Sequence, residues 1–341
     1  MAEATFRFYH DQLPDDNWRD FYIKAEAAVR SHAPMLRYPK VLSQSVQDYS
    51  RVLAYVYSDH PELFYFNSYG CKYLITTTSV IVQLSYCETA ADMQKKTAEI
   101  DRAVEKIFAE CFPQGVEKAS ELRREKKIFD WLTDHVTYDH VSLEKYAKRF
   151  DMLGDAWTAY GALVLKTAVC QGIACAFKLL CDRLGIPSLV VLGFGGERHA
   201  WNIVRINSRF YQVDVTWTLK HSIDLTVPYK RYEYLNIPDA IMHKTHKPDD
   251  DFLPKCTSLR ANPYRIKGLC CRDLADLTDK ALKHAANGED RFAFLCLSGY
   301  PDQRERDELV QKVADSVQGS AVLHYDVHQS YYIGFEIKRR D

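Results

Sequence analysis

Three short segments within one stretch of about 50 residues constrain this 341-residue chain more than any other feature. In order they read AVCQG at 168–172, HAWN at 199–202 and VDVTW at 213–217. They place Cys170, His199 and Asp214 close together in the sequence. A thiol, an imidazole and a carboxylate are the groups of an activated nucleophile, in which the carboxylate orients the base and the base activates the thiol. The local structure predicted around each segment can be compared with that requirement.

The residues that follow Cys170 have the periodicity of a helix. Apolar side chains recur at steps of three or four as far as Leu184, and Gly185-Ile186-Pro187 then stops the helix. Cys170 therefore lies in the first turn, above the buried face and at the positive end of the helix dipole, which favours a thiolate. Gly172 removes a side chain beside it and allows close approach of backbone or substrate.

The next segment predicts a partner sheet. A strand at 188–193 is followed by a glycine-rich loop and by a hairpin of residues 200–206 and 209–216. A two-residue turn at Asn207-Ser208 would pair residue 206 with residue 209. In that register His199 is diagonal to Asp214, and both side chains point to the same side as Trp201. A slip of one residue would separate His199 from Asp214, so the register is a direct test.

This geometry gives each of the three residues a chemical role. Asp214 would fix one ring nitrogen of His199, and the other nitrogen would face Cys170. Cys170 would attack a carbonyl carbon and form a thioester acyl-enzyme, and its backbone N–H at the helix start is a natural oxyanion donor. Each of these residue types, taken alone, more often has a structural role. Because His199 and Asp214 point to the same side of the predicted sheet, we favour a catalytic role over a structural one.

Composition argues against several other classes of function. The net charge of −1 gives no global field toward nucleic acid or an anionic membrane. No apolar run is long enough for a transmembrane helix, and the N-terminus lacks a signal-peptide core, so we expect a cytoplasmic protein unless a signal was removed. We expect a protein or peptide as its substrate, and the oligomeric state stays open.

The ten cysteines are irregularly spaced and contain no CxxC pair. A zinc site would have to gather Cys170, Cys175, Cys181 and His199, whose spacing fits no common pattern. We therefore expect no metal and no cofactor. Most of the other cysteines lie among apolar residues and are expected to be small buried side chains.

The chain is predicted to be an α+β protein of three regions. Residues 1–115 form an N-terminal α+β region, with helices from about 16 and 45, strands at 63–66, 73–77 and 80–86, and a long helix at 90–112. Residues 116–250 form the core, which opens with a helix from Ser120. Residues 251–341 form a small α/β domain, with helices at 272–286 and 307–317 and strands at 291–297, 321–327 and 331–337. Residues 222–265 have no clear period and predict a surface excursion and connector.

These motifs closely resemble those of the transglutaminase-like superfamily of bacterial and archaeal proteins. The resemblance covers about residues 120–220 and is carried by YGAL at 160–163, VCQG at 169–172, HAWN at 199–202 and YQVDVTW at 211–217. IFDWL at 128–132 and YD at 138–139 look like the helix and tail that precede such a core. The resemblance implies a papain-like fold, in which a helix carrying the cysteine packs on an antiparallel sheet carrying the histidine and aspartate. It makes Cys170, His199 and Asp214 the implied triad.

The resemblance also implies an upstream aromatic or amide side chain that helps the oxyanion hole. Tyr160 is the candidate, with Gln171 as the second, although Tyr160 is equally well explained as a packed loop aromatic. Trp201 and Trp217 are expected to pack around the triad. The calcium sites of animal transglutaminases are not visible in this sequence, so no calcium dependence is implied.

The reaction is left open by the resemblance. Members of the superfamily cross-link proteins, hydrolyse peptides or amides, or act as silent interaction modules. We favour hydrolysis of a peptide-type amide, with acyl transfer to an amine and a non-catalytic scaffold as the alternatives. Arylamine acetyltransferases use a similar triad order, but their arginine-glycine-glycine lead-in is absent, and KTAV stands at 166–169.

Overall fold

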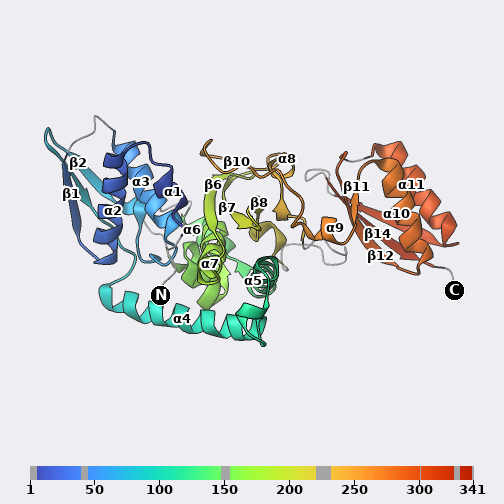
Figure 1. Cartoon of the computed structure of the whole chain (residues 1–341), viewed down its shortest axis with the longest axis horizontal. Coiled ribbons are helices and arrows are strands. Elements are labelled where there is room, and N and C mark those ends of the chain that lie inside the picture. Colours follow the sequence, from blue (N-terminus) through green and yellow to red (C-terminus); the bar gives the residue numbers. More distant parts are fainter. Residues whose placement is uncertain are drawn as a thin grey trace.

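The computed structural model describes residues 6–39, 45–146, 154–219, 232–299, 301–325 and 331–339. The fold is α+β, as predicted, and its N-terminal, central and C-terminal regions follow one another along the long axis of the molecule (Figure 1). Within these ranges no helix combines the length and the apolar character that a bilayer crossing would require.

The N-terminal region combines helices with a three-stranded antiparallel sheet of order β1-β3-β2. Asp15 caps the second helix, since its carboxylate accepts from two backbone N–H groups, and Ser45 forms a capping box at the start of the third. The bounds are α1 (Phe8–Asp11), α2 (Asp16–Arg30), β1 (Met35–Pro39), α3 (Val46–Asp59), β2 (Lys72–Ile75) and β3 (Ser79–Gln83).

The predicted strand at 63–66 is wrong. These residues form turns with a single bridge between Phe66 and Tyr86, and their side chains are almost fully buried. Their aromatic composition reflects burial in a core rather than sheet formation. The strand β1 at Met35–Pro39 was not predicted, because only its long-range pairing with β3 makes it a strand.

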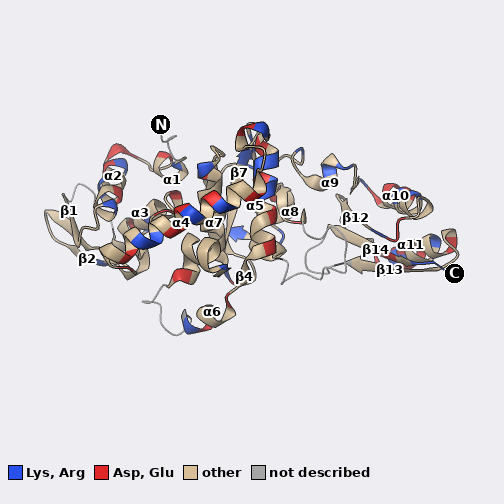
Figure 2. Ribbon diagram, turned by 90° about the horizontal axis from the view of Figure 1, so that it is seen from below, with Lys and Arg blue, Asp and Glu red and all other residues tan. Residues whose placement is uncertain are grey.

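Two long helices connect the N-terminal and central regions. α4 (Ala90–Cys111) runs beneath both regions in Figure 1, and α5 (Glu121–His135) packs against it and against α7. Thr89 and Ser120 cap them through their hydroxyl groups. Acidic and basic residues are interspersed along α4 (Figure 2), which fits the net charge near zero.

The central region is built on α7 (Cys170–Arg183) and a five-stranded antiparallel sheet of order β10-β6-β7-β8-β9. The turn residues Asn207 and Ser208 have φ values of 48° and 64°, so the hairpin pairs Ile206 with Arg209, and the predicted register is confirmed. The strand bounds are β6 (Ser188–Phe194), β7 (Arg198–Ile206), β8 (Arg209–Val213), β9 (Leu235–Ile237) and β10 (Lys247–Pro248).

Strand β8 ends three residues earlier than predicted. The ladder with β7 stops at the pair Asn202–Val213, and the chain then turns into the short helix η5 (Thr216–Thr218). The prediction for 222–265 is also incomplete. Strands β9 and β10 form the two edges of the sheet, whereas residues 222–231 lie outside the described part of the chain.

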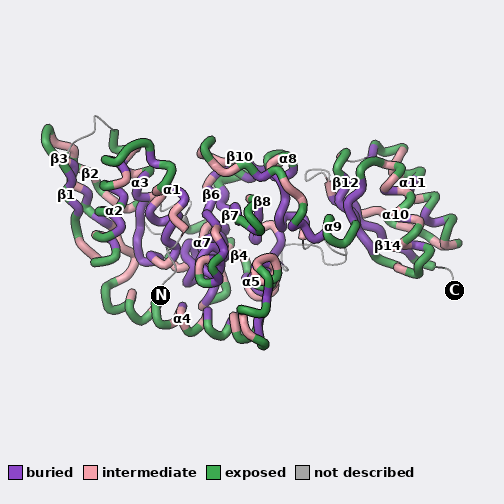
Figure 3. Tube along the Cα trace, viewed as in Figure 1, coloured by how far each residue is buried: buried purple, intermediate pink, exposed green. Residues whose placement is uncertain are grey.

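The two faces of the sheet belong to two different hydrophobic cores. The first core holds Ala200 and Val204 with α7 and continues into α2, α3, α4 and α5, and the second core holds Trp201 and Ile203 and continues into the C-terminal region. Figure 3 shows the sheet and α7 as mostly buried. Asn202 ties helix to sheet, because its amide donates to the carbonyl oxygens of Ala174 in α7 and Leu189 in β6.

The C-terminal region packs two helices on a four-stranded sheet of order β11-β12-β14-β13. Its predicted helices, strand and hairpin are present, although the second helix begins four residues early because Asp302 and Glu305 form a capping box. The bounds are β11 (Cys270–Cys271), α10 (Leu274–Ala286), β12 (Arg291–Cys296), α11 (Gln303–Ser316), β13 (Ser320–Tyr325) and β14 (Tyr332–Lys338). The three-domain division stays a prediction, and the first core crosses its boundary at 115/116.

Candidate active site

Cys170 is the first residue of α7 and has 8% of its surface exposed. The glycine two positions later is required by the local packing. A Cβ at Gly172 would collide with the backbone carbonyl oxygens of Ala156 and Thr158, in and after the short helix η3 (Asp155–Trp157). The sequence predicted that Gly172 allows close approach of either backbone or substrate, and the structure shows backbone in that space. This contact fixes the start of α7, and with it the position of the thiol.

His199 and Asp214 form a buried hydrogen-bonded pair. The Nε2 atom of His199 lies 2.7 Å from Oδ2 of Asp214, and the aspartate side chain has no exposed surface. The backbone N–H of Trp217 donates to the other carboxylate oxygen at 3.2 Å. Because an ionised carboxylate only accepts, Nε2 carries the hydrogen and Nδ1 has no bond to the carboxylate. The Cys170 side chain lies near the same ring and helps to raise the pKa of His199. The hairpin register predicted from the sequence had already placed the side chains of His199 and Asp214 next to each other on one side of the sheet.

Electrostatics favours a charged imidazole at this place. Burial alone would lower the pKa of His199, but the charge and hydrogen bond of Asp214, together with Cys170, raise it well above the ordinary value. Burial would raise the pKa of Asp214, and the two histidines bonded to it hold that pKa below the ordinary value instead. The arrangement therefore stabilises an imidazolium between a carboxylate and a sulfur atom.

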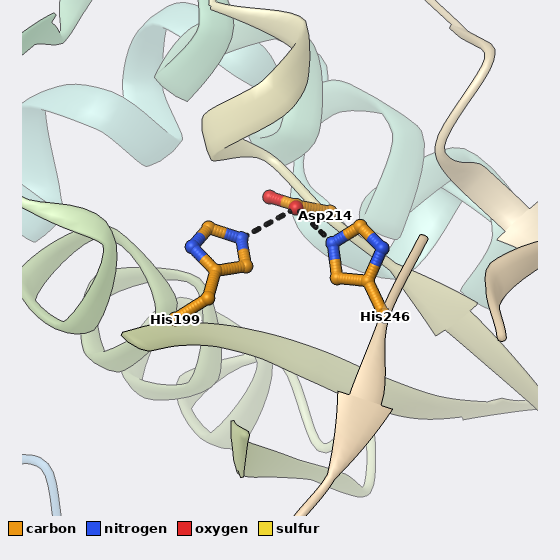
Figure 4. A group of neighbouring side chains, drawn as sticks. All are labelled: His199, Asp214 and His246. Carbon is orange, nitrogen blue, oxygen red and sulfur yellow. Dashed lines mark hydrogen bonds and ion pairs between the residues drawn. The ribbon is translucent and has the colours of Figure 1, made fainter. Parts of the chain in front are cut away.

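A second histidine, His246, completes the surroundings of Asp214. Its Nε2 atom lies 3.0 Å from Oδ2, the same oxygen that His199 contacts, and its side chain has no exposed surface (Figure 4). Its Nδ1 atom lies 2.8 Å from the hydroxyl oxygen of Thr245. Sequence reasoning missed His246 because it lies in a stretch without periodicity, 32 residues beyond Asp214 in the chain.

The ligand atoms of His199, Asp214 and His246 lie within 4.8 Å of one another, which is close enough to surround a metal ion. Both nitrogen–oxygen separations, however, are those of ordinary N–H···O hydrogen bonds. Protons alone satisfy the three groups, so we assign no metal ligand here. The grouping of Cys170, Cys175, Cys181 and His199 is not among the metal-binding clusters of the described residues.

Tyr138 is an aromatic residue beside Cys170 that the sequence indicated only as part of the tail before the core, and not as a site residue. Strand β4 (Thr137–Tyr138) pairs in parallel with β5 (Thr167–Ala168), and this pairing sets Tyr138 next to Ala168. Burial, the charge of Cys170 and a hydrogen bond with its side chain raise the pKa of Tyr138, whereas a hydrogen bond with the backbone of Cys170 acts in the opposite direction. The phenol of Tyr138 thus lies close to Cys170.

Tyr160, the predicted oxyanion helper, points elsewhere. Its hydroxyl donates to Glu99 of α4 at 2.6 Å, and its ring stacks on Phe64. The packed-aromatic alternative therefore describes its contacts, and Tyr138 occupies the place beside the thiol. Gln171 follows Cys170 in the first turn of α7 and is partly exposed.

Both tryptophans pack around the site, as expected. The rings of Trp201 and Trp217 lie 6.0 and 5.8 Å from that of His199, measured between centroids. The indole N–H of Trp201 donates to Gln212 at 2.8 Å, which satisfies its polar atom inside the second core.

A cysteine at the start of a helix, packed on an antiparallel sheet that carries a histidine and leads into an aspartate, defines a papain-like core. Residues 112–215 match the family model of the transglutaminase-like superfamily, and the chain therefore carries a transglutaminase-like domain in this stretch. The resemblance seen in the sequence is confirmed there.

Two curated proteins are similar to part of the chain. The kyphoscoliosis peptidases of Homo sapiens and Mus musculus are each 27% identical to it, over 151 and 152 residues respectively. The matched region covers 39% of this chain and 22% of each relative. Among solved structures, one described as a TGase is 15% identical, covers 53% of this chain and 50% of its own, and has a TM-score of 0.31.

Proposed function

We propose that this protein is a cysteine-dependent hydrolase of peptide or amide bonds, with Cys170, His199 and Asp214 as its triad. The observation that carries the proposal is the buried hydrogen bond between His199 and Asp214, which leaves the second ring nitrogen available to the nearby Cys170 side chain. This is the proton arrangement that thiol acylation requires.

In the proposed reaction, the thiolate of Cys170 attacks the substrate carbonyl carbon. The imidazolium of His199 then gives its proton to the leaving amine as the carbon–nitrogen bond breaks, and a thioester remains on the sulfur. Neutral His199 next takes a proton from water, which attacks the thioester, and the carbon–sulfur bond breaks to release the carboxylic acid and the thiolate, so that the thiolate and the imidazolium are both restored. Asp214 stays ionised throughout and holds the imidazole in one orientation.

The negative oxygen of the tetrahedral intermediate needs hydrogen-bond donors close to Cys170. The backbone N–H of Cys170 at the start of α7 and the hydroxyl of Tyr138 are the two donors we assign to it. Tyr138 takes the role first given to Tyr160, because the Tyr160 hydroxyl is bonded to Glu99.

Hydrolysis is favoured over transfer to an amine by the peptidase names of the two curated relatives. Acyl transfer is the second candidate, since both reactions pass through the same thioester and differ only in the acceptor. A scaffold without catalysis is disfavoured, because a binding role gives no physical reason to bury a carboxylate against an imidazole that faces a thiol.

A peptide library incubated with a labelled primary amine separates these candidates. We expect mass spectrometry to show cleaved peptides without the label, with the activity lost in a Cys170→Ala variant. Cys87→Ala is the matched control, since Cys87 is a partly buried cysteine outside the site. Label on intact glutamine-containing peptides would assign acyl transfer instead. Absence of both products at all pH values tested would contradict the proposal.

A further inference from the structure

We propose that His246 is a positioning residue of this site, which holds Asp214 in place and thereby fixes the tautomer of His199. The inference rests on the proposed function, because it assigns a role within the same site. It extends the machinery to a residue outside the stretch of 112–215 that matches the family.

Two imidazole rings converge on one carboxylate oxygen. Oδ2 of Asp214 lies 2.7 Å from Nε2 of His199 and 3.0 Å from Nε2 of His246. Figure 4 draws the two rings pointing at this oxygen from opposite sides. Both nitrogens must carry hydrogen, because the buried carboxylate offers only lone pairs. With the N–H of Trp217 on Oδ1, the carboxylate has three donors and no contact with water. Rotation of the carboxylate would break bonds on both sides, so His246 acts against that rotation.

The other ring nitrogen of His246 contacts a hydroxyl group. Nδ1 lies 2.8 Å from the hydroxyl oxygen of Thr245, whose hydrogen also has the Met242 carbonyl oxygen within reach at 3.4 Å. His246 donates to Asp214 through Nε2, and His199 donates to the same carboxylate oxygen through its own Nε2. These two bonds leave Nδ1 of His199 as the nitrogen of that ring without a bond to the carboxylate.

The backbone around His246 is built to bring it to this place. The next two residues form β10, which pairs with the end of β6 through Lys247–Phe194 and Pro248–Gly193. A Cβ at Gly193 would collide with the Lys247 carbonyl oxygen and the Trp201 ring, so glycine is required for this close approach. Beyond β10, Asp249 accepts two hydrogen bonds from Arg198 at 2.9 and 2.7 Å.

Aromatic rings enclose the imidazole of His246. Its ring centroid lies 4.4 Å from Trp217, 5.0 Å from Trp201 and 5.7 Å from Tyr234. The titratable groups that face it are Asp214, His199 and Tyr234. With water excluded, a hydrogen bond to the charged carboxylate is stronger, and its loss costs more, than at the surface.

The proposal is tested by comparing His246→Gln with His246→Asn. Both substitutions are uncharged and polar, but they differ in reach. The amide of glutamine can occupy the place of Nε2 and donate to Asp214, whereas that of asparagine reaches only the place of Nδ1, next to Thr245. His243→Ala is the control, since His243 lies in the same segment with 42% of its side chain exposed.

The first readout is the rate at which iodoacetamide alkylates Cys170, measured from pH 5 to 10. We expect His246→Asn to slow the reaction about tenfold to a hundredfold at neutral pH and to change its pH profile. We expect His246→Gln and His243→Ala to stay within about threefold of the starting protein, with its pH profile kept. Equal rates in the two His246 variants, whether fast or slow, would overturn the proposal. So would failure of both to fold, since His246 would then be a core residue only.

The second readout does not depend on catalysis. The ¹⁵N chemical shifts of the His199 ring report which nitrogens carry hydrogen, and a pH titration shows the tautomer once the imidazolium has lost its proton. We expect that tautomer to be Nε2–H in the protein as it stands and in His246→Gln, and mixed in His246→Asn. If the starting protein neither cleaves peptides nor has a reactive Cys170, the proposed function fails. The ¹⁵N shifts still test whether His246 positions Asp214 and His199, because they do not depend on activity. An unchanged His199 tautomer in His246→Asn would overturn the positioning role by itself.

Discussion

The two faces of the central sheet are built in different ways. On one face, α7 packs on Ala200 and Val204, and the core continues into the N-terminal helices. On the other face, the core around Trp201 continues into the C-terminal region, and β10 brings His246 in from far along the chain. The first face is covered by α7, which carries the thiol and follows from a local helical period in the sequence. The second face depends on contacts between residues far apart in the chain, and these contacts support the Asp214 carboxylate. The proposed chemistry arises where the two faces meet at the end of the sheet.

Asp214 joins the two faces, so its loss is expected to have the largest effect. Asp214→Asn keeps the shape but removes the negative charge and replaces one oxygen by an NH₂ group. That group cannot accept, so either the two histidines on Oδ2 or the Trp217 N–H on Oδ1 loses its acceptor. We expect the rate of peptide hydrolysis to fall by about 10⁴-fold, the scale known for loss of the carboxylate in such triads. Asp101→Asn serves as the control, because Asp101 lies on α4 in an exposed pair with Arg183. A loss below about tenfold in Asp214→Asn would contradict the role of this carboxylate.

A matched pair of core truncations tests whether the N-terminal region belongs to the catalytic unit. Phe21 and Phe335 are both fully buried, the first in α2 within the first core and the second in β14 of the C-terminal sheet. Each change to alanine should cost about 3–5 kcal/mol. Hydrogen exchange should rise in α7 for Phe21→Ala, whereas for Phe335→Ala it should rise in the C-terminal region and not in α7. Faster exchange of α7 in Phe335→Ala, with no change in Phe21→Ala, would show that α7 depends on the C-terminal region and not on the N-terminal one.

Glu125 predicts a pH effect on the first face. Burial raises the pKa of this α5 carboxyl to about 8, and its Oε2 accepts from Asn236 at 2.8 Å. Since the folded pKa exceeds the unfolded value near 4.5, folding retains a proton between about pH 4.5 and 8, and stability falls as pH rises through that window. Glu125→Gln should remove this loss, worth on the order of 3 kcal/mol near pH 7.

Thermal unfolding measured from pH 4 to 9 checks the Glu125 prediction. The variant should melt at a higher temperature than the starting protein above about pH 6 and at nearly the same temperature at pH 4. A gain that is equal at every pH would contradict an origin in the ionisation of Glu125.

A comparison of Tyr138→Phe with Tyr160→Phe tests which of the two tyrosines takes part in the reaction, since only Tyr138 lies beside the thiol. Tyr138→Phe removes the proposed oxyanion donor and should slow hydrolysis about tenfold to a hundredfold, with KM little changed. Tyr160→Phe removes a hydrogen bond to Glu99, so it should cost about 1 kcal/mol of stability and leave the rate unchanged. If Tyr160→Phe slowed the reaction and Tyr138→Phe did not, the original assignment would be restored.

Much of the local structure that carries Cys170, His199 and Asp214 could be predicted from the sequence, because its signals are local. The apolar period after Cys170 gave α7, and the Asn207-Ser208 turn set the register that brings His199 toward Asp214. The remaining features depend on contacts between distant residues. Tyr138 meets Cys170 only through a parallel pairing of two-residue strands, and His246 reaches Asp214 only because β10 adds to the sheet edge. Neither contact leaves a period or a spacing in the sequence.

The central claim is that the protein activates Cys170 through His199. The most direct test is the rate of Cys170 alkylation at neutral pH, measured site by site with mass spectrometry, in the starting protein and in His199→Ala. We expect Cys170 to react faster than an exposed cysteine in a peptide and His199→Ala to remove that advantage. A Cys170 that reacts no faster than the peptide, with no change in His199→Ala, would contradict the account.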